Sequence, residues 1–251
     1  LANAHDDHWL RLPMYRPLFH LPAAFIFNSP EERDLIHRTF RNAHIPGQVF
    51  GSGVDTARLA EIGEGARASQ AEGSSVTGGA PYVIYVGRVD PSKGCDELFE
   101  HFLRFKAETR SPLKLVLVGG VTMPVPQHED IIALGFLPEE PYELMARAAA
   151  LVLPSRVESL SIVVLEALAL GVPVLVNGQC DVLQGHCARS NAGFHYRSYA
   201  EFRAFLSLLV NRPELSRQLG RHGQQYVQRD YRWETLEDRF VNWFTNLVIN
   251  P

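Results

Sequence analysis

Two cations lie close together after an apolar run near the middle of the chain. Arg88 follows the run Tyr82–Val86, and Lys93 comes five residues later. Arg offers a planar fork of donors and Lys a compact charge, so together they suit a pyrophosphate. Either residue alone is better explained as a solvated surface cation. Because both flank one turn between an apolar run and a helix-forming stretch, we predict an anion-binding role for the pair.

Two glutamates follow a later apolar run. Glu158 is expected just before a helix and Glu166 inside it. Eight helical residues span about 12 Å, which is too far for both carboxylates to chelate one metal ion. The spacing suits two different hydroxyl-bearing groups of one extended ligand. Backbone N–H groups near 159–162 would carry the positive end of the helix dipole and could bind a phosphate between the two acids.

Glu166 stands in an otherwise apolar helical stretch, Ile162–Leu170. The simpler alternative is a charge on the exposed face of that helix. A carboxylate among so many apolar residues needs a partner, because an unpaired buried charge is costly. We therefore expect a polar partner for Glu166 elsewhere in the chain.

Short apolar runs alternate with helix-forming stretches from residue 81 onward. Most of the runs are nearly continuous in Val, Ile and Leu, as strands buried on both faces should be. This alternation predicts right-handed crossovers and a doubly wound parallel sheet of Rossmann-like α/β class, with ligands bound at the carboxyl ends of the strands. The expected strands are Tyr82–Val86, Leu113–Val118, Ile131–Leu137, Leu151–Leu153, Val172–Val176 and Ala192–Tyr196. The expected helices are Asp96–Thr109, Pro141–Ala149, Ile162–Leu170, Tyr199–Val210, Pro213–Tyr231 and Trp233–Val248.

The first 57 residues hold a smaller fragment of the same kind. Ala24–Phe27 predicts a strand, and Ser29 is a good N-cap for a helix that runs to about Phe40. Gln48–Phe50 predicts a second strand. One helix and two strands cannot bury a core alone, so residues 1–57 are expected to belong to a larger unit and to end in a hinge.

Three segments therefore make up the chain. After residues 1–57 comes a stretch rich in Gly, Ser and Ala, residues 58–80, which is interpreted as a flexible linker. Residues 81–251 form one continuous α/β unit. An apolar stripe near its end, in 233–247, is interpreted as core or domain packing.

Composition excludes several classes of protein. The 251 residues are 46% hydrophobic and 21% charged, which argues against disorder, and the net charge of −4 gives no basic field for nucleic acid. No window is apolar enough for a membrane span, and the first residues do not resemble a signal peptide. The three cysteines form no CxxC pair, which favours a reduced, cytoplasmic setting. The four adjacent residues His5-Asp6-Asp7-His8 rarely converge on one ion, so no metal site is assigned.

Several of these segments, taken together, resemble retaining glycosyltransferases of family 4, which have the GT-B fold. The resemblance covers about residues 80–245, in the family's order and spacing. It rests on Val86–Gly94 (VGRVDPSKG), Leu117–Gly120 (LVGG), Gly135–Leu137 (GFL) and the stretch from Glu158 to Val174, with its Glu-x7-Glu spacing and its ALALGVPV ending.

The resemblance implies that a sugar is transferred from a nucleotide-diphosphate donor with retained configuration and without a metal or other cofactor. Arg88 and Lys93 would hold the donor pyrophosphate and stabilise the departing nucleotide. Glu166 would bind the ribose hydroxyls, and Glu158 would contact hydroxyls of the sugar. The candidate catalytic residues are thus Glu158, Arg88 and Lys93. The candidate substrate-binding residues are Gly87, Arg88, Lys93, Phe136, Leu137, Glu158, Ser161, Ile162 and Glu166, with the backbone near 136–137 flanking the base.

Two segments depart from the family pattern. Ser159-Leu160-Ser161 stands where Gly-Phe-Gly is common, which leaves the backbone N–H of Ser161 available but crowds the approach of the sugar. Gly178-Gln179-Cys180-Asp181 replaces the usual Gly-Gly-x-x-Glu, so the identity of the sugar is not specified.

Length is the larger departure, because such enzymes carry two Rossmann-like domains. We expect this chain to be the C-terminal, donor-binding half with a remnant of the N-terminal domain, to which His5-Asp6 would belong. A glycan or lipid-linked acceptor would bind the missing domain, and peripheral membrane association is expected, if at all, only for the full-length protein of polysaccharide biosynthesis. Two other functions stay open: a non-catalytic nucleotide- or partner-binding module, and a nucleotide-sugar epimerase of related fold.

Overall fold

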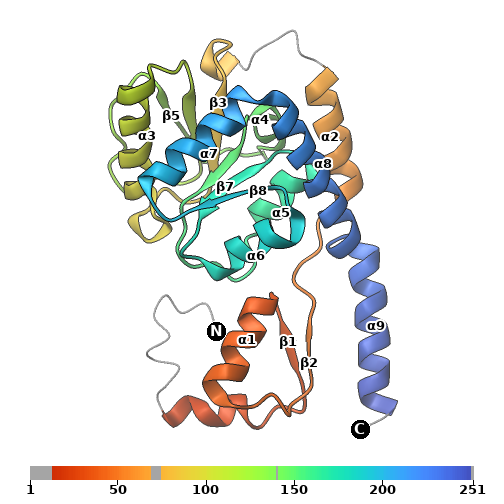
Figure 1. The fold of residues 1–251 in the computed structure, drawn as a ribbon. Coiled ribbons are helices and arrows are strands. Elements are labelled where there is room, and N and C mark those ends of the chain that lie inside the picture. The colour runs from red at the N-terminus through yellow and green to blue at the C-terminus, as the bar shows by residue number, and fades with distance from the viewer. Residues whose placement is uncertain (1–12, 69–74, 140, 250–251) are drawn as a thin grey trace.

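The computed structural model describes residues 13–68, 75–139 and 141–249, which form two units joined by the segment around residues 50–56 (Figure 1). The small unit contains two strands and a helix, and the large unit contains the main sheet. In chain order the elements are η2 (Pro13–Phe19), β1 (Phe25–Phe27), α1 (Pro30–Phe40), β2 (Gly47–Val49), α2 (Thr56–Ala68), η3 (Ser75–Thr77), β3 (Tyr82–Val86), η4 (Pro91–Lys93), α3 (Cys95–Thr109), β4 (Lys114–Val118), β5 (Ile131–Gly135), α4 (Tyr142–Arg147), β6 (Leu151–Leu153), α5 (Ile162–Ala169), β7 (Val174–Asn177), α6 (Asp181–Ser190), β8 (Gly193–Tyr196), α7 (Tyr199–Asn211), α8 (Pro213–Asp230) and α9 (Trp233–Ile249).

The main sheet has the strand order β5-β4-β3-β6-β7-β8, and every neighbouring pair is parallel. From β3 the chain first moves outward to β5, then returns beside β3 and moves outward to β8. The direction of winding therefore reverses between β3 and β6, which is where ligands bind in doubly wound sheets. The α/β class with a doubly wound parallel sheet, predicted from the apolar runs, is confirmed.

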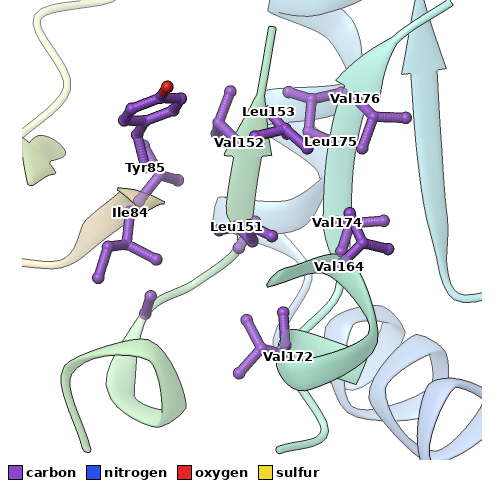
Figure 2. Close-up of a cluster of buried hydrophobic side chains, with 14 of the residues drawn as sticks. Ile84, Tyr85, Leu151, Val152, Leu153, Val164, Val172, Val174, Leu175 and Val176 are labelled. Carbon is purple, nitrogen blue, oxygen red and sulfur yellow. The ribbon is translucent and has the colours of Figure 1, made fainter. Parts of the chain in front are cut away.

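The core of the large unit lies on and around the central strands. Figure 2 shows Ile84 and Tyr85 of β3 beside the side chains of β6 and β7, and all of these are buried. The aliphatic side chains of α5 pack beneath the same strands: Val164, Leu165 and Leu168 are fully buried. A sheet whose central strands are covered on both faces holds its strand ends rigidly, and these ends carry the candidate site.

The expectation of a flexible linker over residues 58–80 is wrong for its first part, because residues 56–68 form helix α2. Gly63 and Gly65 are among the residues that indicated a linker in the sequence. In the structure a Cβ on Gly63 would collide with the carbonyl oxygen of Leu170, so this glycine lets α2 lie directly on the end of α5. The glycine thus serves close helix packing rather than flexibility. Residues 69–74 lie outside the described residues.

A second helix of the large unit was not anticipated either, and several expected boundaries move by one or two residues. Helix α6 occupies 181–190, where the sequence analysis assigned no element, and it buries Val182, Leu183, His186 and Cys187 at helical spacing. Strand β5 ends at Gly135, so Phe136 and Leu137 belong to the loop that follows it. This places them at the carboxyl edge of the sheet.

The small unit follows its sequence signals closely. β1 and β2 pair in parallel, and α1 begins where Ser29 accepts a hydrogen bond from the Glu32 backbone N–H at 3.1 Å. The Glu32 carboxylate accepts in turn from the Asn28 backbone N–H at 2.6 Å, which completes a reciprocal cap. A separate buried cluster joins Ile36 and Phe40 of α1 to Phe19 and Phe27.

Helix α9 leaves the large unit and runs beside the small one (Figure 1). Its Phe240 and Trp243 rings contact the ring of Phe50, and Arg239 Nη2 donates to the Val49 carbonyl at 2.7 Å. The apolar stripe of this helix therefore packs in part on the small unit, while Trp233 and Phe244 remain about half exposed.

Candidate functional site

The candidate site begins where strands β3 and β4 end. Val86 and Val118 pair at the last position of the two strands, so Gly87 and Gly119 leave the sheet together. Gly119 has a φ of 135°, and a Cβ on it would collide with the Gly87 carbonyl oxygen. Glycine is therefore required for this close approach of two backbones. The result is a bare backbone edge at the point where the winding reverses.

The turn after Gly87 is fixed by side-chain hydrogen bonds. The Tyr85 hydroxyl donates to the Arg88 carbonyl at 2.7 Å, and burial raises the pKa of Tyr85, so this hydroxyl stays a donor. Asp90 caps the 3₁₀ helix η4. Hydrogen bonds from the Ser92 hydroxyl and then from the Thr122 hydroxyl lower the pKa of Asp90 to about 2. Asp90 is thus an anion, and Arg88 Nε lies 3.5 Å from its Oδ2.

Lys93 and Glu158 meet across 65 residues of sequence. Lys93 Nζ lies 2.9 Å from Glu158 Oε1, and the two side chains are 29% and 15% exposed. Lys93 ends η4, and Glu158 lies in the loop between β6 and α5. Arg88 does not share this carboxylate, since it faces Asp90 and is 58% exposed. The structure therefore brings Lys93 and Glu158 together and leaves Arg88 at the rim.

Helix α5 starts next to this ion pair, at an unusual backbone position. Ser161 precedes the helix with a φ of 63°, in the left-handed region that favours glycine, and it is buried. Its hydroxyl has no hydrogen-bond partner among the described residues. The first helical bonds run from Val164 and Leu165 to the Ser161 carbonyl, so the N–H groups of 162 and 163 precede the hydrogen-bonded ladder. An anion could accept from them.

Glu166 has the polar partner that its apolar surroundings required. The Tyr142 hydroxyl donates to Glu166 Oε1 at 2.9 Å, and Glu166 is half-buried. The Arg58 guanidinium of α2 lies 5.6 Å from the centre of the Tyr142 ring. Neither Tyr142 nor Arg58 could be found from local sequence, because Tyr142 lies 24 residues before Glu166 and Arg58 falls in the segment taken for a linker.

An open cleft of about 850 Å³ adjoins this pair. It is lined by Arg58, Leu137 and Tyr142, together with the residues around them on α2 and α4. Phe136 is 82% exposed beside it, in the loop after β5. Of the candidate binding residues, Leu137 thus borders the cleft directly, whereas the Phe136 side chain projects into solvent and leaves its backbone as the available contact.

A buried histidine supports the loop before α5. His186 of α6 is fully buried, with Nε2 2.6 Å from the Leu160 carbonyl oxygen and Nδ1 3.0 Å from the Tyr226 hydroxyl. Burial lowers the pKa of His186 to about 4, so the ring is neutral at physiological pH. The sequence analysis gave His186 no role, since its partners come from other elements.

Lowering the pH from about 6.5 to 4 is expected to destabilise the fold by roughly 3 kcal/mol through His186, at about 1.36 kcal/mol per pKa unit. In this range the unfolded chain binds a proton at this histidine and the folded chain does not. The stability is therefore fully present above the unfolded pKa and is lost as the pH falls. Urea unfolding at pH 7 and pH 4.5 measures the difference.

His186→Gln is the control for this pH dependence, since glutamine does not titrate. Its unfolding free energy should fall less between the two pH values than that of the unaltered chain. Equal falls in the two proteins would contradict the assignment.

The described residues contain neither a metal-binding group of side chains nor a helix that could span a membrane. No group of three or more His, Cys, Asp and Glu side chains is placed to hold a metal ion in those ranges. No helix in them is both long and apolar enough to span a bilayer. The segment His5–His8 lies outside the described residues.

The arrangement as a whole can bind an elongated anionic ligand. A cation paired with a carboxylate lies beside free helix N–H groups, and a second carboxylate on the same helix accepts from Tyr142, which lines an open cleft. Helix N–H groups and a lysine can share a diphosphate, while carboxylates accept from hydroxyl groups on either side of it.

Comparison with known families gives one match that covers most of the chain. The model described as "Glycosyl transferases group 1" matches residues 67–226. This range contains every residue of the candidate site except Arg58.

Curated relatives and solved structures are similar as well. A D-inositol 3-phosphate glycosyltransferase of Rhodococcus erythropolis is 28% identical over 90% of this chain and 54% of its own length. One of Geodermatophilus obscurus is 31% identical over 78% of this chain and 46% of its own length. The chain thus spans about half the length of these relatives. Sucrose-phosphate synthase of Thermosynechococcus elongatus superposes with a TM-score of 0.77 at 21% identity, over 99% of this chain and 64% of that one. The HepE protein of Anabaena, solved with UDP and glucose, gives 0.74 at 16% identity, over 96% and 70%.

Proposed function

The chain belongs to the group 1 glycosyl transferase family, and we propose that its large unit binds the nucleotide-diphosphate sugar from which the sugar is transferred. The observation that carries the proposal is the Lys93–Glu158 pair beside the start of α5. It supplies a cation for a diphosphate and an acceptor for sugar hydroxyls within one small region. A solved relative described with UDP and glucose supports a donor of this class.

In this proposal the transfer breaks the bond between the anomeric carbon and the diphosphate and forms a bond from that carbon to an acceptor hydroxyl oxygen, whose proton passes to the departing diphosphate. Negative charge then grows on the departing diphosphate. Lys93 and the N–H groups at the start of α5, which are in place before the reaction begins, stabilise that charge together with Arg88, which the ligand draws inward. Lys93 can serve the diphosphate and Glu158 together, since an ammonium group has three donors. We propose that no metal ion is needed, because these groups supply the positive charge, and that the configuration is retained as in family 4.

Glu166 is proposed to accept from the ribose hydroxyls. Its Oε1 already accepts from the hydroxyl of Tyr142, and Tyr142 lines the cleft. The nucleobase then lies along the loop that follows β5, where Leu137 borders the same cleft and Phe136 precedes it. A pyrimidine or purine diphosphate of UDP or GDP type fits this description equally.

We propose that the small unit is the end of an N-terminal domain that binds a saccharide, glycan or lipid-linked acceptor. Its two-stranded parallel sheet leaves Ile26 exposed, and α9 of the large unit packs beside it. The full-length protein would then act in polysaccharide biosynthesis in the cytoplasm. The described chain alone is expected to bind the donor and to transfer sugar poorly.

The test is a calorimetric titration of the chain with UDP, GDP and ADP. Binding of at least one of them is expected, and binding of none would refute the proposal. Transfer by the full-length protein to a saccharide separates an enzyme from a non-catalytic nucleotide-binding module. Conversion of the donor sugar without any acceptor would indicate an epimerase instead.

Glu166→Ala is expected to weaken the binding of the preferred nucleotide about 10-fold or more, because a hydrogen bond to a charged group is worth about 1.5–3 kcal/mol. The loss should be smaller for the 2′-deoxy analogue, which lacks one of the hydroxyls. Glu129→Ala, which removes an exposed carboxylate outside the cleft, just before β5, is the matched control. Equal losses for the ribonucleotide and its deoxy analogue would exclude the ribose role.

A further inference from the structure

A chain of hydrogen bonds runs from the small unit to the loop that precedes α5. The Arg189 guanidinium of α6 pairs with the Glu31 carboxylate of α1, in the small unit. Arg189 Nε donates to the Tyr226 hydroxyl oxygen at 3.3 Å. Tyr226 in turn lies 3.0 Å from His186 Nδ1, and His186 Nε2 lies 2.6 Å from the Leu160 carbonyl oxygen. Four elements of the fold are thus linked through side chains.

The direction of each hydrogen bond follows from the groups themselves. The Leu160 carbonyl can only accept, so His186 Nε2 must carry the proton. The ring is neutral, which leaves Nδ1 as an acceptor for the Tyr226 hydroxyl proton, and the Tyr226 hydroxyl also lies 3.2 Å from the Tyr231 hydroxyl. The Tyr226 oxygen then accepts from Arg189, which cannot lose its charge. The chain is therefore polarised in one direction, from the arginine to the carbonyl.

Burying this chain of polar side chains lowers the stability of the fold relative to apolar packing, so its retention indicates a function. His186 is fully buried, with its ring against the rings of Tyr226 and Tyr231, and an aliphatic side chain there would avoid the cost of desolvating an imidazole. What the chain gains is a fixed position for the Leu160 carbonyl. That carbonyl precedes Ser161. The left-handed backbone of Ser161 directs the polypeptide into α5, whose first N–H groups follow.

We infer that the Glu31–Arg189–Tyr226–His186 chain positions the Leu160–Ser161 backbone for donor binding and makes that position depend on the docking of the small unit. The inference rests on the proposed function. The four side chains of this chain are positioning residues, since none of them is among the residues proposed to contact the donor. When α1 is docked on α6, Glu31 holds Arg189, and the hydrogen bonds behind it keep the α5 N–H groups aimed at the diphosphate.

The experiment compares UDP affinities of folded variants of the chain by calorimetry at one temperature well below unfolding, with GDP or ADP in its place if that is the nucleotide bound. Glu31→Ala breaks the chain at the small unit, and Tyr226→Phe removes the hydroxyl that His186 accepts from. Each should weaken binding about 5-fold or more, the lower range for coupling between linked sites. Asp34→Ala removes a carboxylate from the exposed side of the same helix, and its affinity should not change.

His186 provides the conservative rescue. His186→Leu should weaken binding as much as Tyr226→Phe does, while His186→Gln, whose amide can still donate to the Leu160 carbonyl, should recover part of the loss. In the unaltered chain, nitrogen NMR should show the proton of this ring on Nε2. A proton on Nδ1 would contradict the direction assigned to the chain.

The outcomes separate this inference from the proposed function. If the unaltered chain binds no nucleotide, both fail. If it binds a nucleotide and folded Glu31→Ala and Tyr226→Phe bind it equally well, the proposed function stands and the positioning role is overturned.

Discussion

Lys93→Ala is expected to slow sugar transfer by the full-length protein about 100- to 1,000-fold. Its ammonium is the least exposed cation of the site and is held by Glu158 at 2.9 Å, so it is in place before charge develops on the diphosphate. Removing one such preorganised donor costs on the order of 2.7–4 kcal/mol of transition-state stabilisation. Arg88→Ala should cost less, because Arg88 is 58% exposed and must be drawn inward by the ligand. Initial rates at saturating donor measure both effects.

Binding measurements on the chain itself test the same assignment without turnover. Lys93→Ala and Arg88→Ala should each weaken UDP far more than uridine, since only UDP carries the diphosphate. Lys114→Ala is a matched control, because Lys114 starts β4 at the opposite edge of the sheet. Equal losses for UDP and uridine would show that neither cation contacts the diphosphate.

Gly119→Ala is expected to lower the unfolding free energy by about 2 to 6 kcal/mol. Half of this is the cost of a left-handed backbone for a residue with a side chain, about 1–3 kcal/mol, and half is overpacking against the Gly87 carbonyl, about 1–3 kcal/mol. Chemical denaturation measures the loss. Nucleotide affinity should fall as well, because the turn carrying Arg88 must move away.

The neighbouring glycine gives a sharp control for this variant. A Cβ on Gly120 would meet no atom within 4 Å, and Gly120 does not have a left-handed backbone. Gly120→Ala should therefore leave stability nearly unchanged. A similar loss in the two variants would mean that the close approach of Gly87 and Gly119 does not constrain the site.

The sheet could be predicted because its central strands are apolar on both faces. β3 and β6 were located to the residue, since Pro81 and Gly87 bound the first apolar run and Pro154 ends the second. The start of α1 was also predictable, because Ser29, Pro30 and Glu32 act within four residues of one another. Signals of this kind depend only on local sequence.

The errors arose where a residue's role depends on a distant partner. Gly63 looked like part of a linker because its contact with Leu170 lies more than 100 residues away. Helix α6 shows apolar residues at helical spacing, yet Gly185 and the polar residues around it weakened that signal. In both cases tertiary packing outweighed intrinsic propensity.

Some residues of the candidate site could likewise be selected from local sequence, and others depend on contacts with distant elements. Residue types and spacing were enough to select Lys93, Glu158 and Glu166, and the structure joins the first two in one ion pair. Their roles toward a donor stay predictions. The Tyr142 hydroxyl on Glu166 and the His186 support of Leu160 could not be foreseen, because each joins elements that only the folded sheet brings together.

The chain passes between the two units twice, before α2 and again before α9, and the two passages lie side by side. Val54 bridges to Arg232, and the Val54 backbone N–H donates to the Tyr231 carbonyl at 2.9 Å. Because the two crossings are held together at one place, we expect any movement of the small unit to be a rotation about this place rather than a translation. A rotation that carries α1 away from α6 must separate Glu31 from Arg189. This ion pair therefore opposes the rotation, and it does so less strongly as the ionic strength rises.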